Sequence, residues 1–139
     1  MSTLSIKTAI INKLDDMGSL KAVFAYETGN PNGKYPFATV TIKDGDGIYR
    51  TNRHNERRYG YWIRIYQEQN KVGQGMSAAE DISIDVIDEL MTAFDMDTTL
   101  SGICKFVEVV SFKADYVNRE LDSRILEIEV NAHDIVASL

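Results

Sequence analysis

Apolar residues recur every three or four positions in two stretches of the chain, and this spacing predicts two helices. The first stretch covers residues 3–17, and Gly18 follows at the point where a helix is expected to end. The second runs from about Ser77 to Phe94, and Ser77 with Glu80 forms a capping box at its start. Its apolar stripe consists of Ile82, Val86, Ile87, Leu90, Met91 and Phe94. We therefore expect each helix to bury one face.

A different pattern, the alternation of apolar and polar side chains, is typical of half-buried strands. It occurs in segments 36–43, 59–67, 104–114 and 124–133, and a short apolar run at 22–26 is a further candidate strand. The expected order is α-β-β-β-α-β-β, with no internal repeat and no linker. This order predicts a single domain over residues 1–139, of the α+β class, in which two helices pack on an antiparallel or mixed β-sheet.

The segment 104–114 differs from the other strands because it is apolar on both sides. We expect one face to carry Phe106, Val110 and Phe112 and the other to carry Val107 and Val109. At about 3.3 Å per residue it reaches roughly 36 Å, close to the diameter of about 37 Å expected of the whole domain. One helix does not cover both faces, so we expect a neighbouring subunit to cover the remainder.

Between the second and third predicted strands lies a polar segment, residues 44–58, which we call the arm. Its basic side chains are Arg50, Arg53, His54, Arg57 and Arg58. Connections between paired strands usually have two to five residues, so this one is unusually long. As a hairpin with about seven residues in each leg, it extends about 20 Å. We predict an arm that docks on an acidic neighbour through arginine–carboxylate pairs. Removal of residues 47–56 is then expected to leave a folded domain that docks more weakly on its partner. The alternative is a solvent-exposed loop.

The composition narrows the possible classes of function. The chain has 139 residues and a formal net charge of −6, and an acidic domain repels the phosphates of nucleic acids. Cys104 is the only cysteine, which excludes an intrachain disulfide and a Cys-based zinc site and suits assembly in a reducing cytoplasm. No signal peptide is expected, because the N-terminus lacks a charged start, a continuous apolar run and a small-residue cleavage site. No membrane span is expected, because no apolar run approaches 18 residues.

Candidate catalytic and cofactor-binding residues are few. The only histidines are His54 and His133, and we expect His133 on the polar side of its strand, away from any nucleophile. The Asp-Gly-Asp-Gly run at 44–47 begins like a calcium loop, but the later ligand positions do not match. Gly73 and Gly75 lack the remaining residues of a phosphate-binding motif. We therefore predict no enzymatic activity, no cofactor and no metal.

Several features in this order match one known family. They are the N-terminal helix, the Tyr35-Pro36-Phe37 entry to a strand, the polar arm, the aromatic strand 61–66, the helix that begins Ala78-Ala79-Glu80-Asp81, and the closing strand 124–130. In these features, which span nearly the whole chain, the sequence resembles the tail-terminator (tail-completion) proteins of siphophages, including the minor tail protein U family of lambda-like phages.

This resemblance implies a structural virion protein that acts at the end of a phage tail. It implies a hexameric ring that caps the tail tube, stops its polymerisation and joins the tail to the connector or neck of the head. The arm then contacts the tube protein or the adjacent subunit, and DNA only passes through the bore. The alternatives are another neck or head-completion protein, an enzyme with an unrecognised site, or a small ligand-binding α+β dimer.

Two groups of carboxylates are candidates for the wall of such a bore. Asp81, Asp85 and Asp88 recur at three-to-four spacing on the second predicted helix, and Glu127 and Glu129 lie on the polar side of the last strand. If either group lines the bore, its negative charge repels the DNA and keeps it from binding. The plainer interpretation of both groups is a solvated surface.

Overall fold

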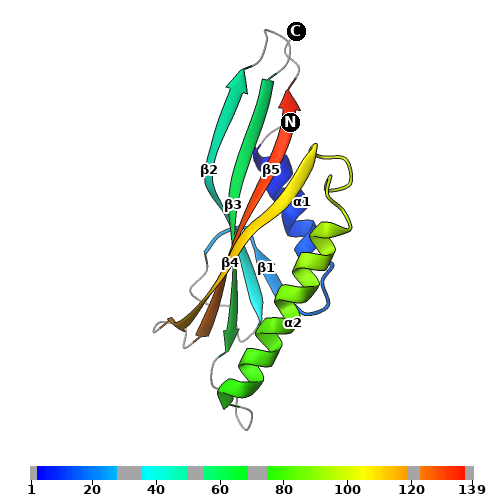
Figure 1. Ribbon diagram of the computed structural model, residues 1–139. Helices are drawn as coiled ribbons and strands as arrows, with labels where there is room; N and C mark the ends of the chain where they lie inside the picture. Colours follow the sequence, from blue (N-terminus) through cyan, green and yellow to red (C-terminus); the bar gives the residue numbers. More distant parts are fainter. Residues whose placement is uncertain (1–2, 28–35, 50–54, 69–74, 119–122, 137–139) are drawn as a thin grey trace.

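Two helices pack against one face of a five-stranded sheet in the computed structural model (Figure 1). The structure describes residues 3–27, 36–49, 55–68, 75–118 and 123–136. The elements are α1 (Thr3–Asp15), β1 (Ala22–Phe24), β2 (Phe37–Tyr49), β3 (Asn55–Glu68), α2 (Gly75–Asp95), β4 (Phe106–Asn118) and β5 (Ser123–Val136). The predicted α+β class and the predicted order of elements are confirmed.

The strands lie in the order β1-β2-β3-β5-β4, so the sheet is mixed. The short strand β1 is parallel to β2, and every other neighbouring pair is antiparallel. At the centre of the sheet β3 pairs with β5 along its whole length, from Asn55 opposite Val136 to Glu68 opposite Ser123. Consequently β1 and β4 are the two edge strands.

The core lies between the helices and one face of the sheet. In α1 the buried residues Ile6, Ile10 and Leu14 follow the predicted helical spacing, and α2 contributes a matching stripe that ends at Phe94. The strands contribute alternate residues, which are Ala38, Val40, Tyr61, Ile63, Ile65, Val107, Leu126, Ile128, Val130 and Ala132. Because side chains alternate along a strand, the intervening residues project from the other side of the sheet. We call that side the open face.

The arm is continuous with the sheet. After an irregularity between Ile42 and Asp44, β2 and β3 stay paired as far as Tyr49 and Asn55, well beyond the predicted strand ends. Polar residues extend the ladder because its hydrogen bonds join backbone groups, which every one of these residues has. On its other side the β3 leg pairs with β5, which ends at Val136. The arm is therefore braced by its own domain, although most of its residues are polar.

A bulge in β4 changes which of its side chains share a face. The pairing with β5 shifts between Val109 and Ser111, and after this shift Phe112 lies opposite Ile128, which is buried in the core. Residues directly opposite one another on paired strands project to the same side of the sheet. Phe112 therefore lies on the helix side together with Val109, and the prediction that groups it with Phe106 is wrong. The extra residue of a bulge reverses the alternation, and the sequence pattern does not reveal it.

Candidate assembly surfaces

The structure separates the predicted basic residues of the arm. Arg50, Arg53 and His54 lie outside the described residues. Arg57 and Arg58 are consecutive in β3, so their side chains project to opposite sides of the sheet. Each of these two arginines has to be considered alone.

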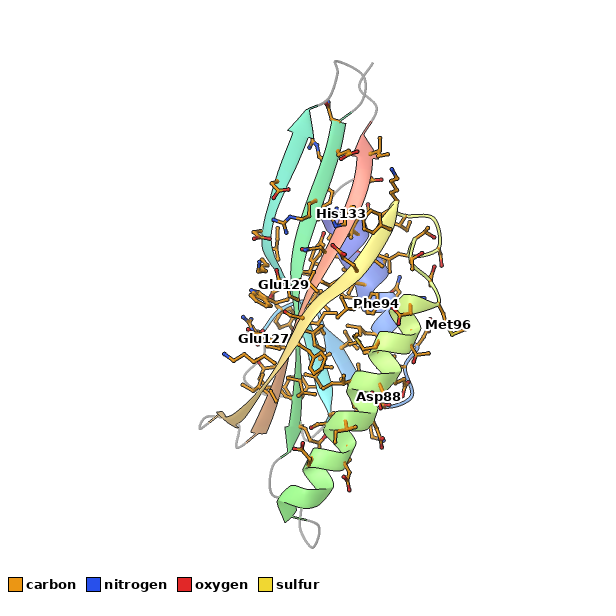
Figure 2. The ribbon with its side chains drawn as sticks, in the orientation of Figure 1. Asp88, Phe94, Met96, Glu127, Glu129 and His133 are labelled. Carbon is orange, nitrogen blue, oxygen red and sulfur yellow. The ribbon has the colours of Figure 1, made fainter. Side chains whose placement is uncertain are left out.

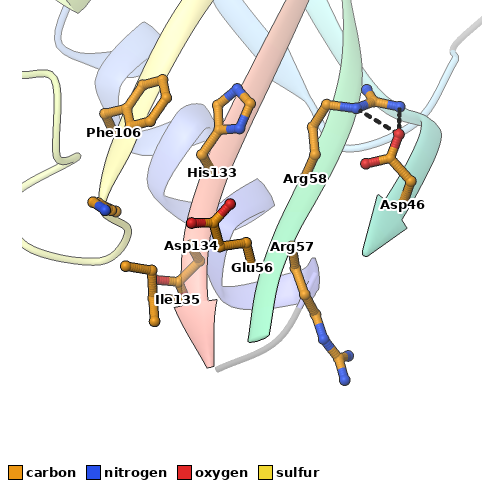
Figure 3. Close-up of a pocket in the computed structure, with 9 residues that line it drawn as sticks. Asp46, Glu56, Arg57, Arg58, Phe106, His133, Asp134 and Ile135 are labelled. Atoms are coloured by element: carbon orange, nitrogen blue, oxygen red, sulfur yellow. Dashed lines mark hydrogen bonds and ion pairs between the residues drawn. The ribbon is translucent and has the colours of Figure 1, made fainter. Parts of the chain in front are cut away.

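Arg58 lies on the open face and is held by its own chain. Its guanidinium donates hydrogen bonds to Asp46 at 3.0 and 3.1 Å, to Asp44 at 3.0 Å and to Asn131 at 2.8 Å. Figure 3 shows the contact with Asp46. The hydrogen bonds that Arg58 donates to Asp44 and Asp46 raise the pKa of Arg58, and Arg58 in turn lowers the pKa of Asp44. Arg58 thus joins β2, β3 and β5.

Gly60 makes room for this contact. A Cβ atom at Gly60 would lie 2.3 Å from Oδ1 of Asp44 and 3.1 Å from the Arg58 guanidinium. Real Cβ atoms do not approach other atoms so closely, so any larger residue displaces the Asp44 carboxylate. The absence of a side chain at this position lets the ion pair lie close to the strand.

Arg57, by contrast, is exposed and points away from the sheet (Figure 3). It makes no hydrogen bond or ion pair with any other residue that the structure describes. Within the described part of the arm, Arg57 is therefore the cation that remains available to a partner.

Two further ion pairs cross the open face below the arm. Arg64 contacts Glu127 at 3.0 Å, and Lys43 contacts Glu129 at 2.7 Å. The hydrogen bond to Glu129, followed by that to Asp44, raises the pKa of Lys43. Glu127 and Glu129 therefore have cations beside them and are not a row of unpaired negative charges.

Glu27 belongs to the same surface, although nothing in the sequence pattern singles it out. It follows β1, and its carboxylate accepts hydrogen bonds from Thr39 at 2.8 Å, Arg64 at 3.1 Å and Tyr66 at 2.5 Å. Burial alone would raise the pKa of Glu27, but the hydrogen bonds from Tyr66, Thr39 and Arg64 outweigh burial and lower it. Burial and the contact with Glu27 raise the pKa of Tyr66. A lone glutamate in a turn carries no periodic signal, so sequence analysis missed this cluster.

The other predicted carboxylates lie on the opposite side of the molecule. Asp81, Asp85 and Asp88 are exposed on α2, and none of them pairs with another described residue. The sequence of α2 contains six acidic residues and no lysine or arginine. Figure 2 shows Asp88 on the helix layer, with Glu127 and Glu129 on the sheet. The two groups of carboxylates therefore do not face the same way.

A cavity of about 290 Å³ lies beside the arm, between the start of β3, the end of β5 and the start of β4 (Figure 3). The ring of His133 stacks on that of Phe106 at 4.3 Å between centroids, and His133 Nε2 lies 2.9 Å from Glu108. His133 projects from the open face, as predicted. The described residues that line the cavity include no serine, threonine or cysteine, so none of them offers His133 a hydroxyl or thiol nucleophile to activate.

The thiol of Cys104 is buried, and burial is the main cause that raises its pKa to about 11. Among the described residues, no group of three or more His, Cys, Asp or Glu side chains is placed to hold a metal ion. No helix in the described part of the chain is long and apolar enough to cross a membrane.

Solved structures with a similar fold are known, although the sequence matches no family of proteins. No family model and no curated protein matches the chain. The chain is similar to a solved structure from the virion of a native gene transfer agent, with 15% identity and a TM-score of 0.54, over 96% of this chain and 95% of that one. It is also similar to the sheath/tube terminator of an extracellular contractile injection system (PVC) in its extended state, with 12% identity and a TM-score of 0.62. The chain has a terminator-like fold.

The two similarities differ in extent. The match to the injection-system protein covers 100% of this chain but 57% of that one, so this chain spans little more than half its length. At such low identity the similarity shows a shared fold. What those proteins assemble with is therefore considered for this chain only as a proposal.

Proposed function

We propose that this chain is a structural subunit of a phage tail or a related tube-bearing particle. It forms a ring that caps the tail tube, terminates its polymerisation and joins the tail to the head or neck. It is assembled in the host cytoplasm and resides in the virion. The observation that carries this proposal is the similarity of the entire chain to a sheath/tube terminator.

The arm supplies a surface for the tube or the adjacent subunit. Its two strands are held in the sheet by β5 and by the Arg58 contacts, which gives a docking element a fixed shape before it binds. Arg57 projects from this rigid support without a partner among the described residues. A carboxylate on the partner is the group that a free guanidinium binds best, through two parallel hydrogen bonds.

Enzymatic activity is no part of the proposal. His133 contacts Glu108 and Phe106, and the described residues that line the cavity beside it supply no hydroxyl or thiol nucleophile. The binding of metals or organic cofactors is likewise not invoked.

A tube-capping experiment tests the function. Tubes are assembled from the tube protein of the same particle, with and without this chain, and are imaged by electron microscopy. We expect rings at tube ends and an end to elongation. Rings that bind the head vertex but not the tube would indicate a neck or head-completion protein instead, and binding to neither would contradict the proposal.

The contribution of the arm is tested by Arg57→Glu, with Lys21→Glu as the matched control. Both residues are exposed, and both substitutions change the charge by the same amount. We expect Arg57→Glu to weaken tube-end binding about tenfold, as for loss of a charge-assisted contact, and Lys21→Glu to leave it unchanged. Equal effects of the two substitutions would show that only net charge matters.

A further inference from the structure

The outer edge of β4 is a strand edge with little protection. At its start, the backbone N–H of Val107 donates to the carbonyl of Thr98, which covers that end. Beyond this point no described strand pairs with it, and the side chains of Val110 and Phe112 are 48% and 55% exposed. Unpaired backbone groups beside exposed apolar side chains favour pairing with another strand.

A second open edge belongs to β2. The short strand β1 pairs with β2 only from Phe37 to Thr39, so no described strand covers the outer edge of β2 from Val40 onward. Figure 1 shows this part of β2 running along the side of the sheet away from β4. Ile42, on this stretch, is 61% exposed. Each chain therefore carries two unpaired strand segments, one at each side of its sheet.

We propose that β4 of one copy of this chain pairs with β2 of the next copy, so that the ring is closed through a continuous sheet. This inference rests on the proposed ring and adds the surface that closes it. Along the order β2-β3-β5-β4 each pair is antiparallel, so β2 and β4 run in opposite directions. A second copy that is rotated about an axis parallel to the strands therefore places its β2 antiparallel to the β4 of the first copy. The second copy does not have to be turned upside down for this. Such a head-to-tail contact generates a ring when the rotation between copies closes, and an open filament when it does not.

The charges of the helices favour this contact over a two-fold contact between two β4 edges. In each chain α1 packs on β1 and β2, whereas α2 packs on β3 and β4. A two-fold β4–β4 contact brings two α2 helices together, each with six acidic residues and no basic residue. The β4–β2 contact instead brings α2 beside the α1 helix of the next copy. That helix carries Lys7 and Lys13 against one acidic residue, Asp15, and of these lysines Lys13 already contacts Asp97 of its own chain. Like charges repel and opposite charges attract across such an interface.

The area of contact also favours a ring over a dimer. A single strand pair is a small interface, below the roughly 1,600 Å² that stable complexes usually bury. In a closed ring, however, every copy makes two such contacts, one through β4 and one through β2. A closed ring is therefore stable, although a single contact between two copies is not.

The same pairing decides which face of the domain lines the bore. With four strands per copy at a spacing of about 4.8 Å, and with tilted strands, a ring of six has a sheet diameter of roughly 40–50 Å. The axes of a helix layer on the inside would lie about 10 Å from the sheet and each helix adds a radius of about 5 Å, so the layer would take up about 30 Å of that diameter. We therefore place the helices outside and the open face inside. The bore is then lined by the Arg64–Glu127 and Lys43–Glu129 pairs, and Asp81, Asp85 and Asp88 lie outside it.

Three lysine substitutions of exposed apolar residues test the pairing. Phe112→Lys places a charge on the β4 edge, and Ile42→Lys places one on the β2 edge. Met96→Lys is the matched control, because Met96 is 83% exposed just after α2, away from both edges. The full chain is examined by native mass spectrometry across a range of concentrations, alone and bound to tube ends. Circular dichroism checks that each variant is folded.

We expect rings from the wild type and from Met96→Lys, and at least a tenfold loss of rings from each edge variant. An equal mixture of Phe112→Lys and Ile42→Lys has only one intact pair of edges, so it is expected to give no rings, and dimers only at the highest concentrations. Rings from both edge variants would overturn the pairing. So would loss of assembly from Phe112→Lys alone, which indicates a β4–β4 contact, or a wild type that is monomeric both in solution and on tube ends.

The outcomes for the pairing and for the function are distinguishable. Wild-type rings that fail to cap tubes contradict the proposed function and leave the pairing intact. Edge variants that cap tubes as well as the wild type contradict the pairing and leave the function intact.

Discussion

The guanidinium of Arg58 connects three strands, because it contacts Asp44 and Asp46 of β2 and Asn131 of β5 from its own position in β3. A single exposed ion pair contributes little to stability, but one cation shared among three acceptors orders several side chains together. Its neighbour Arg57 has no described partner. Two consecutive residues of one chemical type therefore have different roles, one within the domain and one toward a partner.

Arg58→Ala is accordingly expected to lower the free energy of unfolding by about 1 kcal/mol, because it removes the cation beside Asp46 and leaves Asp44 with Lys43 alone. Arg57→Ala, the matched control, is expected to change it by less than about 0.5 kcal/mol. Urea denaturation at neutral pH measures both. Equal losses from the two substitutions would mean that the Arg58 contacts do not stabilise the arm.

Glu27 makes the stability of the domain depend on pH. Its pKa in the folded chain lies below the ordinary value of 4.5, so folding favours its ionised form. The resulting stabilisation is fully present above that ordinary value and is lost as the pH falls through the lowered pKa. Glu27→Gln is expected to cost about 1 kcal/mol at pH 7, after allowance for solvent screening, or about 4 °C in Tm.

The difference in Tm between the wild type and Glu27→Gln is expected to shrink once the pH is well below 4.5. Thermal unfolding from pH 7 down to strongly acidic pH measures it. Thr39→Val is a useful companion, because it removes one hydrogen bond to Glu27 without removing the charge. A constant difference across the whole pH range would show that the carboxylate charge is not what stabilises this site.

At the scale of elements, the arm shows why strand ends are hard to predict from a sequence. The alternation of apolar and polar residues stops near Lys43, because beyond it the sheet no longer packs on a helix. The strands nevertheless continue, since backbone pairing with β5 does not require apolar side chains. Periodicity reports burial, so it predicted the buried half of β2 and of β3 and missed the polar half.

Shortening the arm tests its separate role. Gly47 and Arg57 face each other in the hairpin, so replacement of residues 48–56 by Asn-Gly gives a two-residue turn that suits paired strands. Among the described residues, none in the deleted segment belongs to the apolar core, so the domain is expected to fold with a loss on the order of 1 kcal/mol. Tube-end binding is expected to fall at least tenfold. If the shortened chain does not fold, the arm is part of the folding unit.

The bulge in β4 is a second feature that the sequence pattern does not reveal. The sequence of β4 indicates a strand that is apolar on both sides, and this led to the expectation of a covering neighbour. The phase shift places Phe112 on the helix side, yet leaves it more than half exposed. A neighbouring subunit is therefore still expected to cover β4, but the reason is the open edge of the strand and not an apolar second face.

At the scale of the whole molecule, the fold class and the order of elements could be predicted because each helix and strand has its own hydrophobic period. The neighbours in the sheet could not, since β5 lies between β3 and β4 and no local signal reports which strands pair. The two carboxylate groups illustrate the consequence. Asp88 and Glu127 have the same charge, and the sequence predicts each of them on the polar side of its helix or strand. Only the packing of the helices on one face of the sheet shows that they face opposite ways (Figure 2).

The buried thiol of Cys104 makes this chain convenient for labelling. A thiol whose pKa is raised to about 11 is almost entirely protonated at neutral pH, and the protonated form reacts poorly with maleimides. A cysteine introduced at an exposed position on β2, β4 or the arm would therefore carry a fluorophore at one known place, without prior removal of the native residue. Energy transfer between dyes on neighbouring copies would then follow assembly as it happens.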